Sequence, residues 1–179
     1  MAVVISDASP LICLAAIRQF NLLRLLYGEV LIPEAVWQEI TRAPTFAAAA
    51  SLQVATEARS VGWLQVATAG NRPLVMQLET VLDPGEAEAI ALAVECAPSL
   101  LLIDERDGRQ MARTLGVPLT GTLGVLLRAK ALGHTPAIKP LLTELVAQHH
   151  FRLHPSLVHQ VLTEAGEATG SMAVRLSTP

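Results

Sequence analysis

The sequence has few of the residues that stabilise small secreted proteins. It contains two cysteines, Cys13 and Cys96, which lie in apolar stretches typical of buried thiols. Two cysteines are too few for a disulfide framework. Aromatic residues make up only 3% of the chain. The core must therefore consist of aliphatic side chains, which suit helices packed against a parallel sheet.

Long apolar runs and a strong charge of one sign are also missing. No run reaches the roughly 18 residues of a membrane span, and the most apolar stretch, residues 11–32, is interrupted by Arg18 and Arg24. No basic segment precedes this stretch, so we expect no signal peptide, no membrane span and a cytoplasmic location. The net charge of −3 argues against a broad nucleic-acid-binding surface. It does not exclude a nuclease that recruits positive charge as a metal ion.

The chain is rich in apolar residues, which indicates a large buried core. Hydrophobic residues make up 51% and charged residues 16% of the 179 positions. This length and composition predict one globular domain, over residues 1–165. Small and polar residues dominate from Gly166 onward, so we expect a flexible tail over residues 166–179.

The first ten residues predict a strand, a tight polar turn and a helix. Residues 3–5 are apolar and β-branched throughout, which is typical of a strand buried on both faces. Asp7 and Ser9 follow, and Pro10 is well tolerated in the first turn of a helix. Asp7 is thus expected at the carboxyl end of a strand, where ligands of open α/β sheets bind.

The same strand–helix order recurs along the chain and predicts the fold class. The expected strands are residues 3–5, 30–32, 63–66, 100–103 and 117–120, with an edge strand at 151–153. The expected helices are residues 11–26 with a break near 19–21, 33–40, 46–60, 83–97, 111–115, 123–132, 139–150 and 155–165. This order predicts a three-layer α/β/α sandwich with a mostly parallel sheet of about five strands. Residues 67–73 are expected to be the most mobile loop, and residues 104–109 a polar turn.

Four acidic residues fall at positions that suit a metal site. Asp7 and Asp104 each follow a strong strand, and parallel strands place their carboxyl ends at one edge of the sheet. Glu86 lies in the first turn of a helix, and Glu39 lies near the end of another. Carboxylates gathered in one place repel one another unless a cation lies between them. Mg²⁺ prefers such oxygen ligands.

Each of these acids also has a purely structural interpretation. Asp7 can cap the helix that follows it. Glu86 can simply favour the dipole of its helix, and Glu39 can be a solvated helical acid. Glu105 and Asp107 can pair with neighbouring arginines on the surface. The positions alone leave these alternatives open.

Five short motifs, in order, resemble those of PIN-domain proteins, and in particular a prokaryotic toxin-like subgroup. The motifs are Ile5–Ile12, Ile32–Ile40, Leu82–Ala93, Leu101–Arg109 and Thr120–Leu126. The resemblance covers about residues 1–165. It implies a compact α/β/α domain that gathers acidic residues around Mg²⁺ or Mn²⁺ and cuts RNA.

The resemblance also implies roles for individual residues. The catalytic set is Asp7, Glu39, Glu86 and Asp104, and the metal ligands among them are Asp7, Glu86 and Asp104. Many relatives have Asp where this chain has Glu86, whose side chain is one methylene longer. A fifth acid would be Glu105 or Asp107, and the motif does not decide between them. Ser9 would supply a nearby hydroxyl. Many such proteins are homodimers and are toxins neutralised by a small antitoxin, so both are expected partners, with RNA as the substrate.

Basic residues and competing activities complete the sequence-based hypothesis. Arg106, Arg109 and Lys130 are candidates to hold substrate phosphates, since arginine binds phosphate bidentately. A catalytically silent PIN-like module that binds RNA or protein is the main alternative. An aspartyl-phosphate phosphatase is disfavoured, because that chemistry needs a second aspartate where Ser9 stands.

Overall fold

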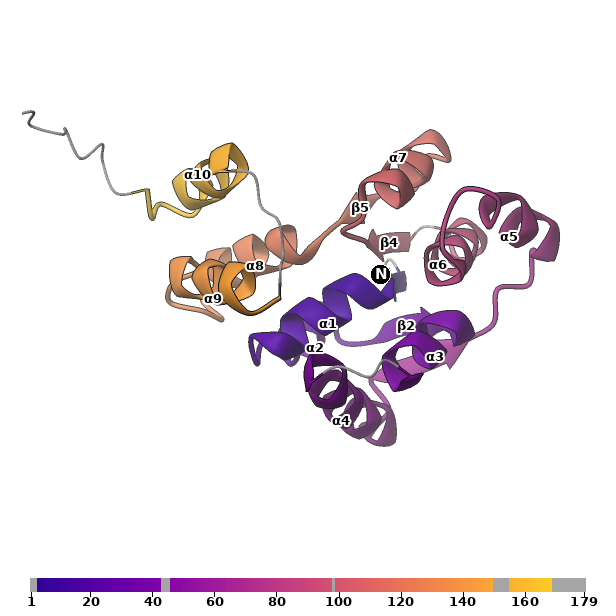
Figure 1. The fold of residues 1–179 in the computed structure, drawn as a ribbon, viewed down its shortest axis with the longest axis horizontal. Coiled ribbons are helices and arrows are strands. Elements are labelled where there is room, and N and C mark those ends of the chain that lie inside the picture. Colours follow the sequence, from indigo (N-terminus) through magenta and orange to yellow (C-terminus); the bar gives the residue numbers. More distant parts are fainter. Residues whose placement is uncertain (1–2, 43–45, 98, 150–154, 169–179) are drawn as a thin grey trace, which may run out of the picture.

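The computed structural model describes residues 3–42, 46–97, 99–149 and 155–168, and shows one five-stranded sheet (Figure 1). The strands are β1 (Val3–Ser6), β2 (Val30–Pro33), β3 (Leu64–Ala67), β4 (Ser99–Leu102) and β5 (Leu119–Thr120). Their order in the sheet is β3-β2-β1-β4-β5, and every pairing is parallel. The predicted α/β class and parallel sheet are therefore confirmed.

Helices connect the strands and pack on both faces of the sheet. They are α1 (Ala8–Ala16), α2 (Leu22–Tyr27), α3 (Glu34–Arg42), α4 (Phe46–Val61), α5 (Arg72–Leu78), α6 (Pro84–Glu95), α7 (Arg106–Thr114), α8 (Thr122–Ala131), α9 (Lys139–His149) and α10 (Pro155–Glu164). In the described part of the chain, none of them combines the length and the apolar character needed to cross a bilayer.

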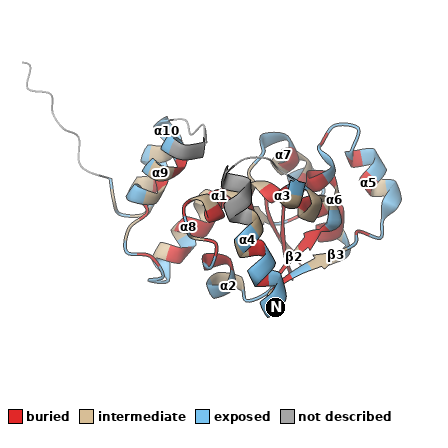
Figure 2. Ribbon diagram, turned by 60° about the horizontal axis from the view of Figure 1, so that its bottom comes forward, coloured by how far each residue is buried: buried red, intermediate tan, exposed pale blue. Residues whose placement is uncertain are grey.

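Alternating side chains of the strands divide the core into two clusters. Val4 and Leu102 belong to the cluster under α1, α3, α4, α8 and α9, whereas Ile5 and Leu101 belong to the cluster under α6. This alternation follows from the two-residue period of a strand. Burying both faces explains why the strands are continuous apolar runs. Figure 2 shows β2 coloured as buried between the helices.

The strand order creates a switch point at the centre of the sheet. From β1 the chain moves outward to β2 and β3, then returns to add β4 on the other side of β1. Ser6 of β1 lies opposite Leu102 of β4, and Asp7 donates its backbone N–H to the Leu102 carbonyl at 2.9 Å. In open α/β sheets ligands bind at the carboxyl edge of such a point. The residues after β1 and β4 therefore lie where a site is expected.

The local predictions are confirmed in one place and wrong in others. The break in the first predicted helix is real and separates α1 from α2, but residues 106–109 begin helix α7 and are not a turn. Asp107 lies in the first turn of α7, where its charge favours the helix dipole. The predicted loop at residues 67–73 is shorter than expected, because Arg72 already begins helix α5. The predicted strand at 151–153 lies outside the described residues.

Glu167, which lies beyond the predicted domain boundary at residue 165, is bound to the rest of the domain by polar contacts. Glu167 pairs with the ammonium of Lys130 and accepts backbone N–H groups of Ile138 and Lys139 at 2.8 and 2.9 Å. These contacts lower the pKa of Glu167 to about 2. The chain is therefore held at least as far as Glu167. Of the predicted tail, residues 169–179 lie outside the described residues.

The packing of the core predicts that replacing leucine by alanine at two positions of α2 lowers the free energy of unfolding by very different amounts. Leu23 is fully buried, whereas Leu25 is 52% exposed. We expect Leu23→Ala to lower the free energy of unfolding by about 2–5 kcal/mol and Leu25→Ala by less than about 1 kcal/mol. Urea denaturation of the two variants measures this difference. Equal costs would contradict the packing described above.

Candidate functional site

A cleft of about 670 Å³ opens at the carboxyl edge of the sheet. It is bordered by the end of β1, by α3, by the turn between α5 and α6, and by the starts of α6 and α7. The residues that line it are Asp7, Ser9, Glu39, Glu79, Thr80, Val81, Leu82, Asp83, Glu86, Glu105, Arg106 and Asp107. Seven of these are acidic and one is basic, so the cleft is strongly negative.

Asp7 lies at the base of the cleft and has two roles. Its side chain caps α1 by accepting the Ser9 backbone N–H at 3.4 Å, so the structural interpretation of this residue is correct. The same residue is 3% exposed and lines the cleft, so capping does not exclude a role in the site. Burial, followed by the charges of Glu39 and Glu86, raises the pKa of Asp7 to about 7.

The carboxylates of Glu39 and Asp7 both lie close to Gly85. A methyl group on Gly85 would lie 3.1 Å from Glu39 Oε2 and 3.3 Å from Asp7 Oδ1. Both carboxylates therefore converge on the backbone at the start of α6, and the absence of a side chain at Gly85 makes room for them. Burial raises the pKa of Glu39, and the charges of Asp83 and Glu105 raise it further.

Glu86 uses one carboxylate oxygen for the fold and leaves the other unpartnered. Its Oε2 accepts the backbone N–H of Asp83 at 3.3 Å, which completes a capping box at the start of α6. Its Oε1 is buried and has no hydrogen-bond partner among the residues that the structure describes. A methyl group on Gly108 would collide with this carboxylate. Burial raises the pKa of Glu86. A buried carboxylate oxygen without a donor is costly unless a cation or water satisfies it.

The start of α7 brings Glu105, Arg106 and Asp107 to the cleft. The sequence left Glu105 and Asp107 as alternatives, and the structure places both at the cleft. Arg106 is the one cationic side chain among the described residues that line it. Glu79 and Asp83 also line the cleft. The sequence singled out neither residue, because Asp83 only begins the helix predicted from residue 83 and Glu79 lies outside the predicted elements.

Three sequence-predicted residues do not line this cleft. Asp104 turns to Thr122, from which it accepts two hydrogen bonds. Arg109 donates from Nη1 to the Ile103 carbonyl at 2.7 Å. Lys130 pairs with Glu167. Of the predicted residues, the structure thus brings together Asp7, Ser9, Glu39, Glu86 and Arg106.

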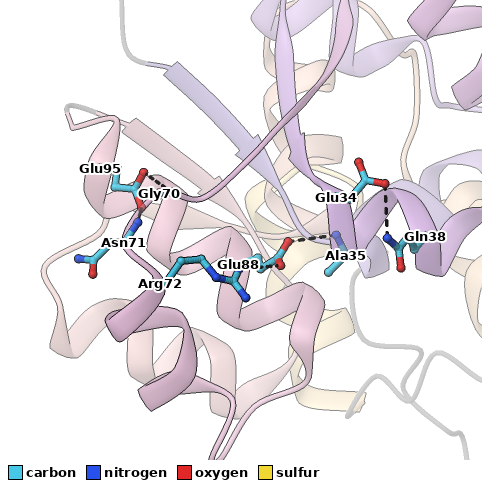
Figure 3. A network of polar contacts seen from close by, with 8 residues as sticks. All are labelled: Glu34, Ala35, Gln38, Gly70, Asn71, Arg72, Glu88 and Glu95. Carbon is cyan, nitrogen blue, oxygen red and sulfur yellow. Dashed lines mark hydrogen bonds and ion pairs between the residues drawn. The ribbon is translucent and has the colours of Figure 1, made fainter.

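A network of polar contacts outside the cleft joins α3, α5 and α6 (Figure 3). Glu88 accepts the backbone N–H of Ala35 at 3.1 Å and pairs with Arg72 at 3.4 Å, which ties α5 and α6 to α3. Glu95 accepts the backbone N–H groups of Gly70 and Asn71 at 3.0 and 2.6 Å. The loop expected to be the most mobile is therefore anchored at both of these residues.

The cleft offers the type of ligand atom, carboxylate oxygen, that a hard divalent cation prefers. Asp7, Glu39 and Glu86 supply carboxylate oxygens, and Glu86 Oε1 is a buried acceptor without a donor. Among the described histidine, cysteine and acidic residues, however, no group of three or more side chains is close enough together to hold a metal ion. The carboxylates share a cleft, and closing around a cation would require their side chains to rotate.

The raised pKa of Asp7 predicts how the stability of the metal-free protein depends on pH. Asp7 has a pKa of about 7 in the folded state and near 3.8 when unperturbed, so the folded state binds more protons between these values. Its contribution to stability is therefore complete below about pH 4 and is lost as pH rises through about 7. With metal chelated, unfolding should become easier from pH 5 to pH 8, by up to about 1.4 kcal/mol per pH unit.

Asp7→Asn removes this titration and keeps a good helix cap. We expect it to flatten the pH profile and to raise the melting temperature at pH 8. Thermal unfolding followed by circular dichroism in chelator checks both effects. Parallel profiles for the variant and the unmodified protein would contradict the assignment.

Comparison with known proteins places the chain in a family. A family model described as a PIN domain matches residues 3–167, which is most of the chain and includes every residue of the cleft. No significant match is found among curated proteins or among solved structures. The family match agrees with the five-stranded parallel sheet and the acidic cleft at its edge. The chain therefore belongs to the PIN domain family, whose members are generally metal-dependent nucleases.

Proposed function

We propose that this protein is a metal-dependent ribonuclease that hydrolyses phosphodiester bonds of RNA in the acidic cleft. The observation that carries the proposal is the unpartnered, buried Oε1 of Glu86 in a cleft shared with Asp7 and Glu39. Asp7 and Glu86 are buried and Glu39 lies beside them, so gathering these carboxylates without a counter-charge is unfavourable, and the pKa of each is raised. An external cation relieves this cost.

Asp7, Glu39 and Glu86 are the proposed holders of Mg²⁺ or Mn²⁺, with Glu105 beside them. Glu105 lines the same cleft, and its charge raises the pKa of both Glu39 and Glu86. When bound, a divalent cation supplies Lewis-acid chemistry, since it polarises the phosphoryl group and makes water a better nucleophile. The role of the carboxylates is to keep this charge at the edge of the sheet.

Arg106 is the proposed contact to the substrate phosphate. It is exposed, lines the cleft and stands between the acids Glu105 and Asp107. A guanidinium binds phosphate oxygens bidentately. Ser9 places a hydroxyl at the same cleft. Arg109 and Lys130 are occupied by contacts elsewhere, so we do not assign them to substrate.

The proposal includes the biological setting implied by the sequence resemblance. The five motifs resemble those of prokaryotic PIN-domain toxins, which supports a role as the toxin of a toxin–antitoxin pair. A small antitoxin and a second copy of the chain are the corresponding proposed partners. The support for this setting is the resemblance, whereas the support for the chemistry is the cleft.

Asp7→Asn tests the chemistry. We expect the unmodified protein to cleave labelled RNA only with Mg²⁺ or Mn²⁺, and the variant to be slower by about a hundredfold or more. Glu57→Gln, at an exposed acid of α4, is the matched control and should keep full activity. Metal binding without cleavage in the unmodified protein would favour a silent RNA- or protein-binding module instead.

Arg106→Ala tests the phosphate contact. We expect a KM for RNA raised about tenfold with little change in kcat, and a salt dependence of binding lowered by about one unit of slope. Arg113→Ala, at an exposed arginine in the last turn of the same helix, is the matched control. Equal effects of both substitutions would show that the change reflects net charge rather than a contact in the cleft.

A further inference from the structure

Asp104 follows β4, yet its carboxylate is directed to another part of the chain. Its Oδ1 accepts the backbone N–H of Thr122 at 2.8 Å, and its Oδ2 accepts the Thr122 hydroxyl at 2.5 Å. Thr122 is completely buried and is the first residue of α8. Both oxygens of Asp104 therefore already have a donor, in contrast to the unpartnered Oε1 of Glu86.

The surroundings of Asp104 join three segments of the chain. Arg109 of α7 donates to the carbonyl of Ile103, the residue immediately before Asp104. A methyl group on Gly121 would collide with the Asp104 carboxylate and would lie 3.0 Å from Arg109 Nη1. The end of β4, the first turns of α7 and the start of α8 are thus packed without space for one additional carbon atom.

The residue after Asp104 begins the stretch that borders the cleft. Glu105 is the N-cap of α7, and Glu105, Arg106 and Asp107 all line the cleft, whereas Asp104 does not. A shift of the Asp104 backbone would move these three side chains together. Groups that orient the ligands of a metal site affect affinity without touching the ion.

We propose that Asp104 is a positioning residue, which fixes the start of α7 through Thr122 and thereby places Glu105, Arg106 and Asp107 at the cleft. This inference rests on the proposed function for the metal and the substrate. The placement of α7 itself does not depend on it. The alternative, implied by the motif resemblance, is that Asp104 is itself a metal ligand.

Two substitutions separate these alternatives. Asp104→Asn removes the charge but keeps an acceptor for the Thr122 N–H and offers an amide to its hydroxyl. Thr122→Val keeps the Asp104 charge but leaves Oδ2 without its donor. If Asp104 is a metal ligand, Asp104→Asn weakens metal binding. If Asp104 is a positioning residue, Thr122→Val weakens it. Thr122→Ser keeps the hydroxyl and serves as the conservative control.

The experiment measures Mn²⁺ binding by calorimetry, with melting temperature as the check of folding. We expect Asp104→Asn and Thr122→Ser to bind Mn²⁺ within about threefold of the unmodified protein. We expect Thr122→Val to bind at least about tenfold more weakly. Loss of binding in Asp104→Asn together with normal binding in Thr122→Val would overturn the proposal and make Asp104 a ligand.

Hydrogen exchange supplies a readout that needs neither metal nor activity. We expect the hydrogen-bonded backbone amides of residues 109–114 in α7 to exchange faster in Thr122→Val than in Asp104→Asn. Should the unmodified protein bind no Mn²⁺, the proposed function fails, and these exchange rates alone decide the positioning role. Equal rates in the two variants would overturn it.

A second variant covers the case in which Thr122→Val does not fold. Gly121→Ala keeps every hydrogen-bonding group but places a methyl group against the Asp104 carboxylate. We expect weaker Mn²⁺ binding and faster exchange at the start of α7. A folded Gly121→Ala protein with unchanged binding and exchange would contradict the proposal.

Discussion

The gathering of carboxylates in one partly desolvated cleft is the constraint on which the site depends. Asp7, Glu39 and Glu86 lie in one cleft, and the pKa of each is raised by burial. The fold meets the resulting cost with its aliphatic core and with glycines that leave space for the carboxylates. Gly85 lies against Asp7 and Glu39, and Gly108 lies against Glu86. A larger side chain at either glycine would displace the acids from the positions that the sheet gives them.

Helix capping and lining of the cleft are combined in the same side chains. Asp7 caps α1 and Glu86 completes the capping box of α6, yet both also line the cleft. A carboxylate has two oxygens, so one can satisfy a helix terminus while the other remains available. Helix caps also hold these acids close to the backbone, which limits the rotamer freedom that binding a cation would otherwise cost.

The sequence predicted the elements well because their signals are local. Apolar runs of three or four residues identified β1, β2 and β4, and the helix predicted from residue 83 matches α6. The direction of a side chain beyond a strand end is not a local property. Asp104 is drawn to Thr122, 18 residues later, and Lys130 to Glu167, 37 residues later. These partners depend on packing between distant segments, which is why Asp104 and Lys130 lie away from the cleft.

The order of the strands has a consequence for the nascent chain. The acids of the cleft come from the end of β1, α3, the turn between α5 and α6, and the starts of α6 and α7, and β4 can join β1 only after the crossover through β2 and β3 has been synthesised. Such long-range parallel pairing forms slowly relative to local structure. A chain that has emerged only as far as α5 contains Asp7 and Glu39 but not the helices that complete the cleft. Under the proposed function, the carboxylates that hold the metal would therefore be gathered only in the finished domain.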